Sequence, residues 1–166
     1  MQSALHNIII RPIAPGDNKP IAQVIRTALK EFSADKPGTV YFDATTDSLY
    51  QLFQTGGSVY FVAEKEGQVV GGGGIFPSPG LPAATCELVK MYLLKEARGI
   101  GLGKALIEKS LEWAQQNGYQ QVYLETMPEL QKALSVYEKF GFKYIDAQLG
   151  DTGHFGCDLW MLKELS

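Results

Sequence analysis

The chain has 166 residues, of which 45% are hydrophobic, and its 15 Lys and Arg stand against 18 Asp and Glu, giving a net charge of −3. This length is typical of one domain and is sufficient to bury a core. A negative net charge argues against a basic nucleic-acid surface, and no apolar segment approaches the length of a membrane span. We therefore expect one α/β domain, residues 1–166, with no nucleic-acid or membrane partner.

The N-terminal segment, MQSALHNIIIRPI, has no basic n-region, and its apolar run is too short for a signal sequence. Cys86 and Cys157 are the only cysteines and lack C-x-x-C spacing. Two buried, reduced thiols are the expectation, and a disulfide or a metal site is the alternative. These features predict a cytoplasmic protein.

Residues 7–13 are rich in β-branched side chains and predict a first strand that Pro12 closes. Asp17 is the expected N-cap of a helix with an apolar stripe. Residues 33–44 lose this periodicity and carry two aromatic side chains, Tyr41 and Phe42. These aromatics either line an acceptor pocket or hold the loop against the core. A second, short helix is expected to start at Asp47.

Residues 58–64 and 68–76 predict a hairpin around Glu66-Gly67. Its second strand contains four consecutive glycines, Gly71 to Gly74, which pack poorly and cost conformational entropy in a strand. Either the sheet bulges at this point or some group must approach the backbone closely.

An apolar strand, residues 88–94, leads into Arg98-Gly99-Ile100-Gly101-Leu102-Gly103 and then into a helix that Asn117-Gly118 ends. A glycine-rich turn at a helix N-terminus presents unpaired amide N–H groups and the positive end of the helix dipole. This stretch therefore predicts a binding site for phosphate, with a purely structural tight turn as the alternative.

Two common phosphate-binding motifs do not fit this turn. A Walker loop would need a glycine where Arg98 stands and a hydroxyl where Ala105 stands. The dinucleotide fingerprint G-x-G-x-x-G fails because Lys104 stands where its third glycine is required, although Glu125 lies at a suitable distance for the acid of that motif.

The remaining elements complete the α/β pattern. Residues 121–126 predict a strand, and Pro128 suits the first turn of a helix over residues 129–140. Residues 142–145 and 159–162 then predict a long hairpin, whose glycine-rich connection includes Asp151 and His154.

Two motifs carry a family resemblance. Arg98-x-x-Gly101-x-Gly103, following Met91-Tyr92-Leu93, resembles the coenzyme A motif of the GCN5-related N-acetyltransferases (GNAT). Downstream, ALSVYEKFGF, residues 133–142, resembles the closing helix and strand of that superfamily. The resemblance implies the acyl-CoA N-acyltransferase fold, with a mixed, mostly antiparallel central sheet and about four flanking helices.

The resemblance also implies acetyl-CoA, or coenzyme A, as cosubstrate. It places the backbone of Met91, Tyr92 and Leu93 along the pantetheine arm and the amides of the glycine turn on the pyrophosphate. The expected cofactor-binding residues of that turn are Arg98, Gly99, Ile100, Gly101, Leu102, Gly103 and Lys104. No metal is expected.

For catalysis, Tyr137 matches the tyrosine of the superfamily and is expected to act as general acid toward the departing thiolate. By periodicity alone, Tyr137 would instead be a core side chain. Glu87, at the start of the central strand, is the candidate general base, and it could accept the proton of the amine through a water. Glu125 and His154 are rival bases.

The predicted function is transfer of the acetyl group of acetyl-CoA to a primary amine of a small molecule or a protein. The alternatives are a non-catalytic module that senses acyl-CoA and a nucleotide-binding domain. The sequence leaves the acceptor open, as it does the choice between monomer and homodimer.

Overall fold

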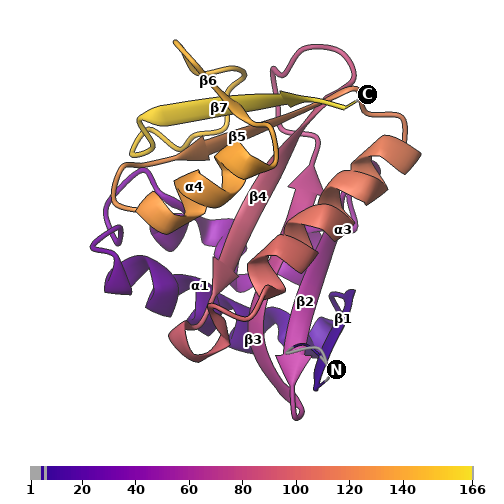
Figure 1. Ribbon diagram of the computed structural model, residues 1–166, viewed down its shortest axis with the longest axis vertical. Helices are drawn as coiled ribbons and strands as arrows, with labels where there is room; N and C mark the ends of the chain where they lie inside the picture. The colour runs from indigo at the N-terminus through magenta and orange to yellow at the C-terminus, as the bar shows by residue number, and fades with distance from the viewer. Residues whose placement is uncertain (1–4, 6, 166) are drawn as a thin grey trace.

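The computed structural model describes residue 5 and residues 7–165 (Figure 1). These residues form one seven-stranded sheet of strand order β1-β2-β3-β4-β5-β7-β6. The strands are β1 (Ile8–Pro12), β2 (Val59–Lys65), β3 (Gln68–Phe76), β4 (Thr85–Leu93), β5 (Gln121–Thr126), β6 (Lys143–Ile145) and β7 (Leu159–Glu164). The α-helices are α1 (Asn18–Glu31), α2 (Leu49–Leu52), α3 (Leu102–Gln116) and α4 (Gln131–Lys139).

All neighbouring strands pair in the antiparallel direction except β4 and β5, which are parallel. The parallel pair is short, because only residues 85–87 of β4 lie opposite residues 121–123 of β5. The sheet is therefore mixed and mostly antiparallel, as the sequence predicts.

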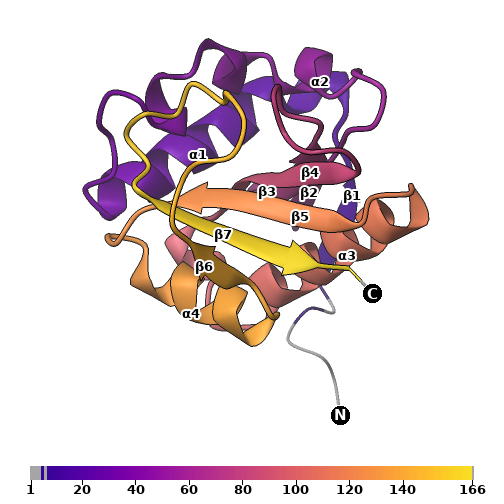
Figure 2. The ribbon, with the colours of Figure 1, turned by 90° about the horizontal axis from the view of Figure 1, so that it is seen from above.

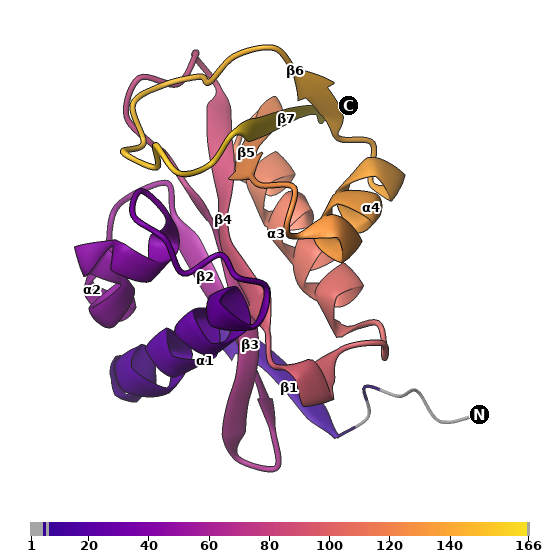
Figure 3. The ribbon, with the colours of Figure 1, turned by 90° about the vertical axis from the view of Figure 1, so that its left-hand side faces the viewer.

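The helices cover both faces of the sheet. Figures 2 and 3 show α1 and α2 on one face and α3 and α4 on the other. Apolar side chains of α1, including Ile21, Ile25 and Leu29, form one core with β2. Side chains of α3 and α4 pack on the opposite face against β4 and β5. We call these the α1 face and the α3 face.

Several predicted element boundaries are confirmed. Strand β5 has the predicted bounds, and the hairpin of β2 and β3 turns at Glu66 and Gly67, both with positive φ. Strands β6 and β7 pair as the predicted antiparallel hairpin. Helix α3 ends at Gln116, directly before Asn117-Gly118, and Gly118 has φ +89°.

The predicted helix starts need correction. Asp17 stands at the N-cap position of α1, but its carboxylate accepts hydrogen bonds from the backbone of Ala14 and the guanidinium of Arg11 instead of capping the helix. Asp47 ends a 3-10 turn, Ala44–Asp47, and is held by Arg26, so α2 begins only at Leu49.

Helix α4 is also shorter than expected. It begins at Gln131 instead of Glu129, and Pro128 lies in the preceding turn, outside the first helical turn.

In the segment expected to lack periodicity, residues 40–42 form a further 3-10 turn. Tyr41 packs against the core of the α1 face, whereas Phe42 is exposed.

Both cysteines are free and buried, as predicted. No helix in the described part of the chain is long and apolar enough to cross a membrane. We expected that the N-terminal segment is not a signal sequence. That expectation concerns mainly residues 1–6, and residues 1–4 and 6 lie outside the described residues.

Candidate functional site

The parting of β4 and β5 opens a cleft in the middle of the sheet. Beyond Glu87 and Tyr123 the two strands no longer pair, and a cleft of about 370 Å³ lies beside them. Strand β4, the glycine-rich turn and the start of α3 line it, together with the end of β5 and helix α4. The lining residues include Leu88, Lys90, Met91, Tyr92, Leu93, Arg98, Gly99, Gly101, Gly103, Lys104, Leu124, Glu125, Thr126, Leu130, Ala133, Val136 and Tyr137.

A bulge in β4 shapes this wall of the cleft. Lys90 has φ +53°, and the pairing of β3 with β4 shifts register at this position. Val89 and the Lys90 ammonium consequently lie on the same face, the α1 face, although strand side chains normally alternate. The buried hydroxyl of Tyr60 donates a 2.7 Å hydrogen bond to the Lys90 carbonyl and so stabilises the bulge.

The glycine run of β3 accommodates protein side chains. A Cβ on Gly72 would lie 2.7 Å from the Tyr60 ring, and one on Gly73 would lie 2.2 Å from the Met91 side chain. Both alternatives for the run are therefore realised, because the sheet bulges and another group approaches the backbone. That group belongs to the protein itself, namely the side chains of Tyr60 and Met91.

The glycine-rich turn has the properties of an anion site. Gly99 and Gly101 have φ +77° and +89°, and a Cβ on either would meet no atom within 4 Å. Among the described residues, the backbone N–H groups from Gly99 to Lys104 donate to no partner, whereas those of Arg98 and Ala105 donate to Lys95 and Gly101. Six consecutive N–H groups at the start of α3 thus remain available to a ligand.

Arg98 differs from the expectation. Its backbone amide is already hydrogen-bonded, and its guanidinium donates to the Leu93 carbonyl, with Nη2 at 2.8 Å. The guanidinium also pairs with Glu31 and lies 4.7 Å from the Phe32 ring centroid. Arg98 therefore ties the end of β4 to α1 and leaves the amides of the following residues free. Ile100 and Leu102 pack under the turn and are not among the lining residues.

Tyr137 lies in α4 and lines the cleft from the α3 face. It is 8% exposed, its ring packs against Phe142, and its hydroxyl makes no hydrogen bond to any described residue. Burial raises the pKa of Tyr137 to about 12, so the phenol is neutral at physiological pH and remains a proton donor.

Glu87 is not at the strand start, since β4 begins at Thr85, and it is not a surface residue, since it is 3% exposed. Its carboxylate accepts a 2.5 Å hydrogen bond from the Ser78 hydroxyl. Burial raises the pKa of Glu87 to about 7 despite this hydrogen bond. Glu87 is not a lining residue of the cleft, so a group in the cleft would reach it only through an intermediary such as water.

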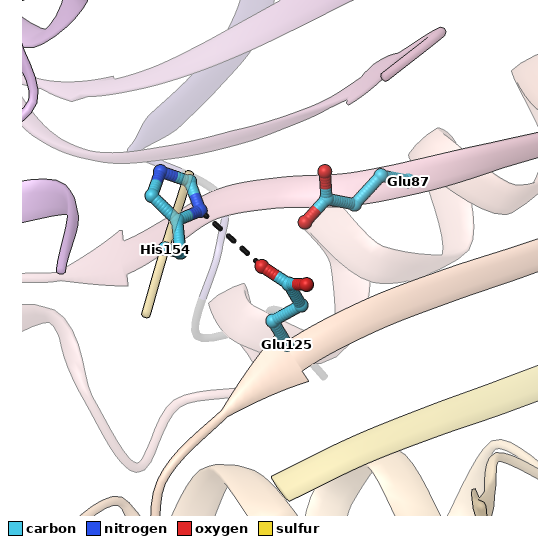
Figure 4. Close-up of side chains that lie close together, drawn as sticks. All are labelled: Glu87, Glu125 and His154. Atoms are coloured by element: carbon cyan, nitrogen blue, oxygen red, sulfur yellow. Dashed lines mark ion pairs between the residues drawn. The ribbon is translucent and has the colours of Figure 1, made fainter. Parts of the chain in front are cut away.

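Figure 4 shows that Glu125 and His154 lie close to Glu87. Through His154 this group contacts Asp43, on the α1 face. His154 Nδ1 lies 3.4 Å from a Glu125 carboxylate oxygen, and its Nε2 lies 3.1 Å from Asp43. Asp43 also pairs with the buried ammonium of Lys90 at 3.2 Å. The structure thus brings Glu87 and both rival bases into one cluster.

The hydrogen bonds separate the pKa values of these groups. Burial alone would lower the pKa of His154, but the hydrogen bonds with Asp43 and Glu125 raise it to about 9. Burial would raise the pKa of Glu125, but hydrogen bonds from His154, Thr152 and Tyr123 hold it below its usual value. The hydrogen bond with His154 lowers the pKa of Asp43 far below its usual range. At neutral pH His154 is therefore an imidazolium between two carboxylates.

Asp43, Lys90 and Ser78 complete this cluster, and sequence reasoning did not identify them. Asp43 lies in the segment without periodicity, and Ser78 lies in a proline-rich loop. The strand pattern places Lys90 in β4 but does not predict the bulge that turns it toward Asp43.

Glu87, Glu125 and His154 could in principle hold a divalent cation, because one ligand atom of each lies within 4.8 Å of the others. A metal, however, requires a neutral imidazole with a free nitrogen. Here each ring nitrogen faces a carboxylate. These groups and Asp43 form an ion-pair network with one another.

Comparison with known proteins agrees with this geometry. Residues 23–142 match the family described as the "Acetyltransferase (GNAT) family". The chain belongs to this acetyltransferase (GNAT) family. Among its relatives, the "uncharacterized N-acetyltransferase YjgM" of Escherichia coli K12 is 45% identical over 159 residues, which cover 95% of each chain.

Solved structures of GNAT proteins share its fold. An acetyltransferase of the GNAT family from Staphylococcus aureus Mu50 superposes with a TM-score of 0.79 at 19% identity, covering 96% of this chain and 99% of that one. The PaiA N-acetyltransferase of Thermoplasma acidophilum, in complex with coenzyme A, superposes with a TM-score of 0.74 at 19% identity, covering 95% and 99%.

This GNAT protein is thus an acyl-CoA-dependent acetyltransferase. Its cleft fits such a cosubstrate. The six free amides and the open space above Gly99 and Gly101 suit a phosphate group. The apolar side chains of Leu88, Leu124 and Val136 suit an uncharged arm.

Proposed function

We propose that this chain transfers the acetyl group of acetyl-CoA directly to a primary amine of a small molecule or a protein, with Tyr137 as general acid and Glu87 as general base. The placement of the two residues carries this proposal. Tyr137 lies on the α3 face of the gap between β4 and β5, and Glu87 lies on the α1 face. Groups on opposite faces can receive a proton from the amine and deliver one to the leaving group without competing for the same site.

In this proposal the N–H groups from Gly99 to Lys104 bind the pyrophosphate of the cosubstrate. The Lys104 ammonium adds a positive charge at the same end of the cleft. Met91, Tyr92 and Leu93 form the wall along which the pantetheine arm extends. Because Arg98 occupies the Leu93 carbonyl, that carbonyl is not available to the arm, and the other backbone groups of this wall remain candidates.

Acetyl-CoA supplies the acetyl group as an activated thioester. The largest contribution of the protein is to position it, since alignment of two reactants can supply roughly 7–11 kcal/mol. The amine enters from the α1 face, where the carboxyl groups of Asp43, Glu87 and Glu125 face the cations His154 and Lys90.

Glu87 is preferred over its rivals as the base. His154 has a pKa of about 9, so it is already protonated at neutral pH and cannot accept another proton. Glu125 is a weak base because its hydrogen bonds lower its pKa. Glu87, with a pKa of about 7, is the carboxylate of the cluster suited to accept a proton near neutral pH, through a water molecule.

Tyr137 is the proposed acid because the residue lines the cleft and its hydroxyl makes no hydrogen bond to any described residue. Its pKa of about 12 exceeds the ordinary thiol pKa of roughly 8.5. The proton transfer is therefore uphill, and a neutral phenol can also stabilise the thiolate by hydrogen bonding.

The proposal is tested with the purified chain, a panel of primary amines and acetyl-CoA, with release of the CoA thiol as the readout. Calorimetry with CoA, ATP and NAD accompanies the assay. Tight binding of CoA alone and turnover with at least one amine support the proposal. Binding of CoA without turnover of any amine would favour an acyl-CoA sensor, and binding of ATP or NAD instead would reject the CoA site. Gel filtration with light scattering distinguishes monomer from homodimer. We also propose that residues 1–166 form a single domain and that the protein is cytoplasmic.

A further inference from the structure

Thr126, the last residue of β5, has a buried hydroxyl without a hydrogen-bond partner. The residue is 3% exposed and lines the cleft. In the described part of the chain, only two buried side-chain polar atoms lack a partner, Thr126 Oγ1 and Trp160 Nε1. Trp160 is not a lining residue of the cleft. Of these two residues, only Thr126 lines the cleft.

A buried hydroxyl without a partner destabilises the free protein, because it has lost its hydrogen bonds to water and gained none in return. Most buried polar side chains in native proteins have a partner, so an exception calls for an explanation. Valine has nearly the same shape as threonine and would avoid this cost. The presence of threonine is explained if the hydroxyl binds a ligand.

The position of Thr126 indicates which part of a ligand it would meet. Side chains alternate along β5, so Thr126 shares the α3 face with Leu124, while Glu125 points to the opposite face. Tyr137 packs on the same face as Leu124. The hydroxyl thus lies on the side of the proposed general acid, away from the ion-pair network.

The surroundings of Thr126 suit an uncharged ligand group. On the α3 face, α4 lines the cleft with Ala133, Val136 and Tyr137, and Lys132 of the same helix also lines it. The N–H groups suited to phosphate lie at the N-terminus of α3, beyond the end of β4. Thr126 lies three residues beyond Tyr123, the last residue of β5 that pairs with β4. In the parallel register it corresponds to the middle of β4. A neutral carbonyl oxygen is the acceptor that fits here.

We infer that the Thr126 hydroxyl donates a hydrogen bond to a carbonyl oxygen of the acylated pantetheine chain, either an amide of the arm or the thioester itself. This inference rests on the proposed function, because it requires that acyl-CoA occupies the cleft. It adds to the cosubstrate site a hydroxyl that makes no hydrogen bond to any described residue of the free protein.

Thr126→Val tests the inference, with Thr126→Ser and Thr46→Val as matched controls. Thr46 is also buried, but its hydroxyl donates a 2.8 Å hydrogen bond to the Val40 carbonyl. Calorimetry gives the Kd of CoA and acetyl-CoA for each variant, and thermal unfolding without ligand gives Tm. We expect Thr126→Val to weaken binding about five- to tenfold, as for the loss of one hydrogen bond, with Tm unchanged or raised.

The controls should behave differently. Thr126→Ser keeps the hydroxyl and should bind within about twofold of the wild type, whereas Thr46→Val should lower Tm and leave Kd unchanged. Weaker binding of both CoA and acetyl-CoA by Thr126→Val assigns the contact to an amide of the arm. Weaker binding of acetyl-CoA alone assigns it to the thioester carbonyl.

Two results would overturn the inference while the proposed function survives. One is wild-type affinity of Thr126→Val for both ligands. The other is a fall in Tm as large as that of Thr46→Val, which would mean that the hydroxyl has a partner within the protein. A wild-type protein that binds neither ligand would instead overturn the proposed function, and this inference with it.

Discussion

His154 Nε2 lies 3.1 Å from a carboxylate oxygen of Asp43, and this pair joins two loops that are 111 residues apart in the sequence. The same imidazole contacts Glu125 at the end of β5. His154 therefore holds the connection between β6 and β7 against the segment that precedes α2. The first prediction concerns the stability that this arrangement provides.

We expect His154→Gln to destabilise the protein in a pH-dependent manner. The folded pKa of His154 is about 9, above its ordinary value of 6.5. A raised pKa contributes stability that is complete below about pH 6.5 and is lost as the pH rises through 9. The variant should lose about 2 kcal/mol at pH 6, or roughly 4–8 °C in Tm, and much less at pH 10. Asp151→Asn, in the same connection, is the control, and an equal loss of Tm at both pH values would contradict the assignment.

Glu87→Gln should remove the acidic limb of the pH–rate profile. In the wild type, kcat/KM should rise with pH until the Glu87 carboxyl, with its pKa of about 7, is ionised, and then level off. The variant should lose about 100-fold in kcat at pH 8 and show no such limb. Glu108→Gln, on the exposed surface of α3, is the control. Persistence of the limb near pH 7 in Glu87→Gln would exclude Glu87 as the base.

The same substitution should stabilise the fold at alkaline pH. The folded pKa of Glu87 lies above its usual value of 4.5, so the stability linked to its protonation is lost as the pH rises through about 7. Glutamine carries no charge and avoids this loss. Thermal unfolding should give Glu87→Gln a higher Tm than the wild type at pH 8, by on the order of 2 kcal/mol of stability, and nearly the same Tm at pH 5. A lower Tm at pH 8 would show that the ionised carboxylate is stabilising.

Tyr137→Phe should separate binding from turnover. The ring remains packed against Phe142, so the fold and the Kd of CoA should be nearly unchanged. Loss of the proton donor should lower kcat by about 100-fold or more. Tyr144→Phe, at an exposed tyrosine outside the cleft, is the control and should retain full activity. Unchanged kcat in Tyr137→Phe would leave Tyr137 as a core residue only.

Gly101→Ala and Gly118→Ala form a matched pair at the two ends of α3. Both glycines have φ +89° and neither has an atom within 4 Å of an added Cβ, so both substitutions should cost about 1 kcal/mol in stability through backbone strain alone. Only the Cβ at Gly101 would stand where phosphate approaches the free amides. Calorimetry should therefore show CoA binding at least about tenfold weaker for Gly101→Ala alone. Equal affinities of the two variants would place the pyrophosphate elsewhere.

Part of this molecule is determined by short stretches of sequence. The bounds of β5, the turn at Glu66-Gly67 and the end of α3 before Gly118 all depend on periodicity and turn residues within a few positions. The glycine-rich turn is equally local, since its free amides follow from its place at the N-terminus of α3. These features could be predicted with little knowledge of the rest of the chain.

Other local signals were overridden by contacts within the fold. Asp17 has the residue type of an N-cap, but Arg11 is within reach and its guanidinium pairs with the carboxylate. The Arg98 amide was expected on a phosphate, but it donates to the Lys95 carbonyl, while the guanidinium is bound to the Leu93 carbonyl and to Glu31. In each case a partner distant in sequence or on another element decided which hydrogen bond forms.

The sequence by itself determined the α/β pattern and the glycine-rich turn before α3, and it supplied Tyr137 and Glu87 as the candidates of the proposed mechanism. Only the tertiary structure decided the protonation states in the site, because these depend on burial and on neighbours that the chain brings together from distant segments. Glu87 has a pKa near 7 because it is enclosed in the sheet, and His154 stays protonated because Asp43 and Glu125 flank it. A strand pattern predicts which residues alternate between the two faces of the sheet. It does not predict where β4 and β5 separate, or that the Glu125 carboxylate contacts the His154 imidazole.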